Sequence, residues 1–204
     1  PRGLICVSDP DDGKLILHAS HQSATRLHGF LCSIFKFQPE QLRVIVGDVG
    51  GGFGTKVAIY PEDVLVVYAA KKLNRPIKWT ATRTEEFQAS VHGRDHMNVA
   101  ELACDSEGRI LALKVKTLAN TGAYLINPAL FIPLGLMCKV ITSVYDIPAI
   151  YLETHCVLTN TAPIGAYRGA GRPEGIYPME RLIDMTAREM GIDPVIMRRR
   201  NLIR

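Results

Sequence analysis

The sequence predicts an α+β fold in which helices pack on mixed sheets. Strand-like and helix-like segments follow one another in the order β-α-β-α-β-β-β-β-α. This order is neither the regular alternation of a parallel α/β protein nor an all-β series. Hydrophobic residues make up 47% of the 204 positions, so the chain carries enough apolar surface to form a substantial core.

The first five segments alternate between strand and helix. A short β-like run occupies residues 15–18, and apolar residues then recur at helical spacing over residues 27–35. The β-branched run at residues 42–46 predicts a buried strand. Pro61 supplies a preset φ for the first turn of a second helix, and residues 77–80 predict another strand.

The remaining segments predict a hairpin, a strand and a long helix. Polar and apolar residues alternate from Met97 onward, and a turn at residues 105–108 separates them from an apolar run at residues 110–115. Residues 151–157 predict a further strand. A long amphipathic helix is expected after Pro173, from the spacing of Ile176, Met179, Ile183 and Met190.

Charge and hydropathy exclude several kinds of partner. The formal net charge is only +4 and is spread along the chain, which argues against nucleic-acid binding. The basic run Arg198–Arg200 is expected to be a solvated helix face. No apolar stretch approaches the roughly 20 residues that span a bilayer, and the N-terminus does not have the form of a signal peptide. We therefore expect a cytoplasmic protein without membrane partners.

The five cysteines form no CxxC pair, which excludes a local zinc, redox or iron–sulfur motif. Free thiols in a reducing compartment are expected instead. The sequence begins with Pro1 and stops after a basic, helix-like run. We expect it to be a piece of a larger protein.

Two glycine-rich loops are candidate binding sites. Residues 166–172 carry Arg168 and Arg172 on a glycine-rich backbone, which suits an oxyanion-rich ligand but also an ordinary loop with solvated arginines. Residues 50–54 follow a predicted strand and allow backbone amides to approach a ligand closely. Thr55 stands where a dinucleotide GxGxxG motif requires glycine, which disfavours nucleotide binding.

Two further groups have both a functional and a plainer interpretation. His92 and His96 are four positions apart, as two metal ligands on a helix would be, but Gly93 and the alternation that follows favour polar loop histidines. Glu85 and Glu86 are expected to be a solvated pair rather than a general acid and base.

Gln22 and the loops 50–54 and 166–172 together resemble the molybdenum-binding large subunit of the xanthine dehydrogenase/aldehyde oxidase family. The order of these motifs and the spacing from Gln22 to Phe53 carry the resemblance, and the Asp193–Leu202 segment also looks like that family. The resemblance covers nearly the whole chain and is closest to bacterial carbon-monoxide-dehydrogenase-like large subunits of the second form. It implies that residues 1–204 are the N-terminal half of a molybdenum cofactor-binding domain.

The resemblance implies a molybdenum–pyranopterin cofactor, with molybdopterin cytosine dinucleotide as the expected form. Gln22 would donate a hydrogen bond to the apical oxo ligand. Gly52, Phe53 and Gly54 would bring main chain and a ring edge against the metal centre. Arg168 would face the metal site and the substrate, where it could stabilise developing oxygen charge. No residue of this chain would ligate the metal directly.

Three departures from the family pattern restrict the expected chemistry. Carbon monoxide dehydrogenases carry a copper-ligating cysteine next to the loop arginine, where this chain has Gly169. Purine hydroxylases carry substrate-binding residues at the positions of Val57 and, by an approximate alignment, Leu136. The catalytic glutamate of the family lies in a Gly-Glu motif that does not occur in this sequence.

The expected activity of the parent protein is hydroxylation of aldehydes or N-heteroaromatic small molecules, with water as the oxygen source. Electrons would leave through iron–sulfur clusters and FAD on partner domains or subunits. Because the remaining half of the large subunit is missing, the fragment alone is expected to be inactive. Two alternatives stay open: a cofactor-free binding or assembly module, and a nucleotide-binding oxidoreductase domain.

Overall fold

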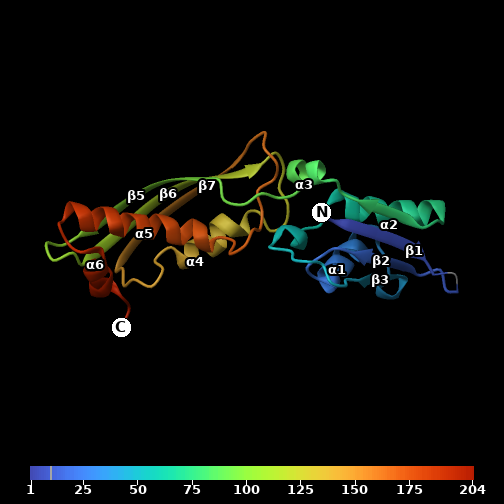
Figure 1. The fold of residues 1–204 in the computed structure, drawn as a ribbon, viewed down its shortest axis with the longest axis horizontal. Coiled ribbons are helices and arrows are strands. Elements are labelled where there is room, and N and C mark those ends of the chain that lie inside the picture. The colour runs from blue at the N-terminus through green and yellow to red at the C-terminus, as the bar shows by residue number, and fades with distance from the viewer. Residues whose placement is uncertain (10) are drawn as a thin grey trace. The chain divides into compact units, whose positions relative to one another are not determined.

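A computed structural model describes residues 1–9 and 11–204 of the chain, which form two compact units. The first unit is Pro1–Val91 and the second is His92–Arg204. Both units combine one sheet with helices, so the α+β prediction is confirmed (Figure 1).

The first unit is built on a four-stranded sheet with the order β3-β2-β1-β4. β1 is antiparallel to both β2 and β4, and β2 is parallel to β3. Its elements are β1 (Gly3–Ser8), β2 (Leu15–Ala19), α1 (Ala24–Phe35), β3 (Leu42–Ile45), α2 (Pro61–Leu73), β4 (Ile77–Thr80) and α3 (Arg83–Ala89). Alternate residues of β1 and β2, among them Cys6 and Leu17, face α1 and α2 and form one core with Leu27, Leu31 and Val67.

The second unit contains a three-stranded sheet with the order β5-β6-β7. β5 is antiparallel to β6, and β6 is parallel to β7. Its elements are β5 (His96–Cys104), β6 (Ile110–Gly122), a π-helical turn (Ile132–Met137) that continues into α4 (Cys138–Val140), β7 (Ala149–Leu158), α5 (Arg172–Glu189) and α6 (Pro194–Asn201). In Figure 1, α5 runs along the strands, and its Met179 and Ile183 pack against Leu113 and Val115 of β6 in the core.

The predicted helices and most of the predicted strands lie within a few residues of the observed ones, but the strand expected at residues 110–115 continues to Gly122 as β6. β1, α3 and the helical segment at residues 132–140 were not predicted. α3 presents no apolar stripe. Its start is fixed instead by a capping box, in which the side chains of Thr82 and Glu85 each accept a hydrogen bond from the other residue's backbone amide. Ile176 of α5 is 38% exposed, so the buried face of this helix is narrower than expected.

Candidate functional site

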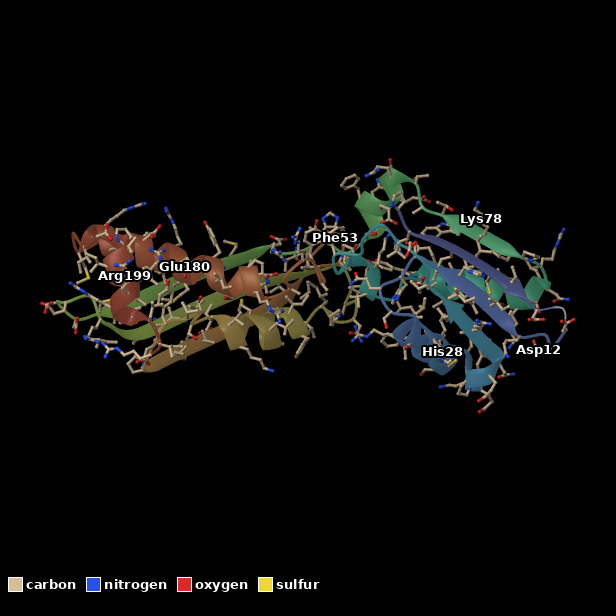
Figure 2. All side chains as sticks on the ribbon, turned by 60° about the horizontal axis from the view of Figure 1, so that its bottom comes forward. Asp12, His28, Phe53, Lys78, Glu180 and Arg199 are labelled. Atoms are coloured by element: carbon tan, nitrogen blue, oxygen red, sulfur yellow. The ribbon has the colours of Figure 1, made fainter. Side chains whose placement is uncertain are left out.

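The glycine-rich loop that follows β3 has an unusual backbone. Gly50, Gly51, Phe53 and Gly54 all have positive φ, and Phe53 adopts this conformation at φ 52° although it carries a side chain. The Phe53 ring, labelled in Figure 2, is 56% exposed. A Cβ atom on Gly51 would lie 2.5 Å from this ring, so glycine at position 51 permits the ring's placement.

Two hydrogen bonds to the backbone at the end of this loop hold Gln22 against it. The Gly54 amide donates to Gln22 Oε1 at 2.8 Å, and the Gln22 amide donates to the Lys56 carbonyl at 2.8 Å. A backbone N–H can only donate, so the side-chain atom that it meets must be the oxygen. The Nε2 group of Gln22 is thereby assigned as a donor on an exposed side chain, and it bonds to none of the residues that the structure describes.

Gly52 makes this arrangement of Gln22 possible. A Cβ atom at position 52 would lie 2.3 Å from Gln22 Cγ and 2.6 Å from Oε1, well inside van der Waals contact. The φ of Gly52 is not in the left-handed region. Space beside Gln22, and not backbone conformation, is therefore what requires glycine at position 52.

Neighbouring hydrogen bonds stabilise the loop. Thr55 Oγ1 donates to the Gly52 carbonyl at 2.9 Å, and the buried Tyr60 donates its hydroxyl to the Thr55 carbonyl at 2.6 Å. Next to Gln22, the imidazole of His21 is only 4% exposed, and this burial lowers the pKa of His21. A neutral imidazole can accept the hydrogen bond that the Ser23 amide donates to His21 Nδ1 at 3.0 Å.

The loop at residues 166–172 belongs to the second unit and leads into α5. Gly169 and Gly171 have positive φ, and Pro173 lies in the first turn of the helix, as predicted. Arg172 Nη1 donates to the carbonyls of Gly169 and Ala170 at 3.1 and 3.4 Å, so this arginine braces its own loop. The Arg168 side chain is exposed, and its guanidinium bonds to no described residue.

Arg94 and Glu174 hold this loop, and both were missed by the sequence analysis. Arg94 Nη2 donates to the Arg168 carbonyl at 2.6 Å, and Nη1 donates to the Tyr167 carbonyl at 3.4 Å. Nη1 also pairs with Glu174 Oε1 at 3.2 Å, and only 3% of the Glu174 side chain is exposed. No local motif could have revealed Arg94, because it lies 74 positions before Arg168.

The two histidines have different surroundings. The His92 backbone bridges to Ile164, and His96 opens β5. His96 Nδ1 is buried without a hydrogen-bond partner, and burial lowers the pKa of His96. Within residues 1–9 and 11–204, no group of three or more His, Cys, Asp or Glu side chains could hold a metal ion.

Two expectations about charged residues were wrong in part. Glu85 is exposed, but the Glu86 carboxylate accepts hydrogen bonds from the backbone amide and the guanidinium of the buried Arg2 at 2.9 and 3.0 Å. Arg199 and Arg200 are exposed as expected, but Arg198 forms 2.8 Å ion pairs with Asp184 and with Glu180, which is labelled in Figure 2. Both pairings join residues from different elements, which local sequence cannot show.

None of the described helices is both long enough and apolar enough to cross a membrane. All five cysteines are free thiols, as predicted, and Cys6 alone among them is fully buried.

The fold and the glycine-rich loops are those of a cofactor-binding domain. A sequence profile of the molybdopterin cofactor-binding domain matches residues 1–202, and the chain belongs to this family. It is similar to the gamma subunit of the 6-hydroxypseudooxynicotine dehydrogenase complex of Paenarthrobacter nicotinovorans, with 33% identity over the whole chain and 25% of the relative. The carbon monoxide dehydrogenase large chain of Hydrogenophaga pseudoflava is 34% identical over 99% of the chain and 25% of the relative.

Solved structures agree with this assignment. The fold matches quinoline 2-oxidoreductase from Pseudomonas putida 86 with a TM-score of 0.95 and 35% identity, covering the whole chain and 26% of that structure. A carbon monoxide dehydrogenase from Oligotropha carboxidovorans matches with a TM-score of 0.92 and 32% identity over the whole chain and 26% of that structure. The chain thus spans about a quarter of the length of these relatives.

The residues of the first unit fit a metal-bound pterin. An oxygen ligand of a bound metal would accept a hydrogen bond, and the Nε2 group of Gln22 is a donor whose amide the Gly54 backbone orients. Gly52 carries no Cβ, and the Phe53 ring is exposed beside it. The fold brings Gln22 against Gly52 and Gly54, although 32 positions separate Gln22 from Gly54.

Proposed function

We propose that the chain is the N-terminal part of the molybdenum cofactor domain in a large subunit that hydroxylates small molecules. The observation that carries the proposal is the Gln22 amide, which Gly54 orients and for which Gly52 leaves space. Together with the family assignment, it supports a role for Gln22 as donor to an oxygen ligand of the metal.

Each residue then has a distinct task. Gln22 donates from Nε2 and fixes the orientation of the cofactor, while Gly52, Phe53 and Gly54 let main chain and a ring edge approach it. When bound, the molybdenum cofactor supplies two-electron oxidation of a substrate carbon with water as the oxygen source. The Arg168 guanidinium, which is exposed and free to turn to a substrate, stabilises negative charge on a substrate oxygen.

The parts that this chain lacks come from elsewhere in the parent protein. The general base is a glutamate from the remainder of the large subunit, and the cofactor is the cytosine dinucleotide form. Electrons pass to iron–sulfur clusters and FAD on partner domains or subunits. The absence of any CxxC pair among the five cysteines supports this division of labour.

The substrate class that fits best is an aldehyde or an N-heteroaromatic ring. Relatives named for quinoline and for a nicotine derivative support the heteroaromatic choice. Gly169 has no thiol to ligate copper, which disfavours carbon monoxide. Val57 and Leu136 offer no charged group to a purine, and Leu136 lies in the π-helical turn against Gly171.

The test is cofactor analysis of the full-length parent, expressed together with a cofactor-insertion system. Molybdenum is measured by elemental analysis and the pterin by chromatography after release. We expect stoichiometric metal in the wild type, a clear loss in Gln22→Ala, and wild-type content in Gln88→Ala, an exposed glutamine of α3 whose side chain makes no hydrogen bond to a described residue. A wild type without molybdenum or pterin would refute the proposal and favour a cofactor-free module.

A further inference from the structure

The segment before β5 and the loop before α5 are joined along their length. The His92 amide donates to the Pro163 carbonyl at 2.9 Å, and the Gly165 amide donates to the His92 carbonyl at 2.8 Å. A Cβ on Gly93 would lie 2.6 Å from Cβ of Tyr167, so glycine allows the two segments to touch there. Arg94 continues this contact with its guanidinium.

The backbone at Arg94 is strained. Arg94 and Asp95 have φ of 72° and 60°, a left-handed conformation that non-glycine residues adopt at a cost of about 1 kcal/mol or more. Asn120 of β6 holds this turn with two hydrogen bonds. Its backbone amide donates to the Asp95 carbonyl at 3.1 Å, and its side-chain Nδ2 donates to Asp95 Oδ2 at 2.6 Å. The strained turn directs the Arg94 side chain to the loop.

The buried carboxylate of Glu174 fixes the other side of the guanidinium. Oε1 accepts from Arg94 Nη1, and Oε2 is buried without a hydrogen-bond partner. Arg94 is the one cation that pairs with this carboxylate among the residues the structure describes. The planar guanidinium meets a carboxylate and two carbonyls at once through a fixed fork of donors, a geometry that the compact ammonium group of lysine does not reproduce.

We propose that Arg94 is a positioning residue for Arg168. Its guanidinium, held by Glu174, binds the carbonyls of Tyr167 and Arg168 and so fixes the main chain from which the Arg168 side chain projects. The role of Arg168 toward substrate rests on the proposed function, but the fixing of the loop does not.

The test compares Arg94→Lys with the wild type in the full-length parent. Lysine keeps a positive charge beside Glu174, so thermal stability is expected to stay near the wild-type value. If Arg94 serves only to neutralise Glu174, hydrogen exchange in the loop of Arg94→Lys stays at the wild-type rate. If Arg94 positions the loop, hydrogen exchange at the Ala170 and Arg172 amides rises by about tenfold or more, because the opened loop exposes them. Arg181→Lys, an exposed change on α5, is the matched control.

Turnover gives the second readout. With Arg168 displaced, kcat of Arg94→Lys is expected to fall by about 10- to 100-fold at unchanged molybdenum content. Wild-type exchange in Arg94→Lys overturns the inference. If Arg94→Lys does not fold, the charge-neutral pair Arg94→Gln/Glu174→Gln replaces it under the same criteria. A parent without molybdenum refutes the proposed function, while the exchange measurement still decides the role of Arg94.

Discussion

Replacing Gly52 by alanine tests whether the space beside Gln22 is what matters at this position. The added Cβ would lie 2.3 Å from Gln22 Cγ and 2.5 Å from Cδ, so one of the two side chains must move. The φ of Gly52 lies outside the left-handed region, and the Gln22 side chain is exposed, so it can move into solvent without disturbing the core. We therefore expect Gln22 to swing away and to lose its 2.8 Å hydrogen bond from the Gly54 amide.

The cost in stability is the value of that one hydrogen bond. A typical intramolecular hydrogen bond contributes about 0.5–1.5 kcal/mol, and the Gly54 amide can turn to water instead, so we expect a loss of about 1 kcal/mol. The effect on the cofactor is expected to be larger, because Nε2 no longer points in a fixed direction. Molybdenum content of the parent should fall in Gly52→Ala as it does in Gln22→Ala.

A double-mutant cycle identifies the cause. Urea unfolding gives the free energy of unfolding of the chain with each change alone and with both. Once Gln22 is alanine, nothing opposes the new methyl group, and Gly52→Ala should then cost nothing further. An equal cost in both backgrounds, or a loss above about 3 kcal/mol, would show that position 52 is constrained by the backbone or the core.

Three further predictions concern buried groups. Burial raises the pKa of Asp63 to about 6 from its ordinary value of 3.8, so its protonated form stabilises the fold below about pH 4 and this contribution disappears as pH rises through 6. The free energy of unfolding relative to Asp63→Asn should fall over that range by at most about 3 kcal/mol, and parallel pH profiles would contradict this. Asn201→Ala leaves the buried Ile110 backbone amide without an acceptor, because this amide donates to Asn201 Oδ1 at 2.8 Å. The free energy of unfolding in urea should fall by about 2–4 kcal/mol, and a loss below about 1 kcal/mol would refute the role of Asn201. Gly171→Ala has φ +83° and a Cβ 2.6 Å from Leu136 Cβ, so we expect a Tm lower by several degrees, and an unchanged Tm would contradict it.

Apolar periodicity predicted the elements that have one buried face. Leu27 and Leu31 are fully buried in α1, and Met179 and Ile183 are buried in α5, at the spacing that predicted these helices. The missed elements have no such stripe. α3 depends on its capping box, and the π-helical turn at residues 132–137 is too short for a periodic sequence pattern.

The loops could be located from the sequence, but the contacts that orient them could not. Glycine and arginine are visible as letters, whereas the pairing of Gln22 with Gly54 bridges 32 positions and that of Arg94 with Arg168 bridges 74. Gln22 was identified only by the family resemblance, whereas Arg168 was visible in its glycine-rich loop and received its role from the resemblance. Arg94 belongs to neither loop, and only the folded chain brings it to the loop before α5.

The two units fix their exposed polar groups to different degrees, and this difference predicts a division of roles. Ordering a long free side chain costs up to about 2 kcal/mol, which a ligand must offset when it binds. The Gln22 amide is already oriented by Gly54, so it can hold a resident cofactor without that cost. At Arg168 only the main chain is fixed, and the free guanidinium suits a substrate that enters and leaves in each turnover.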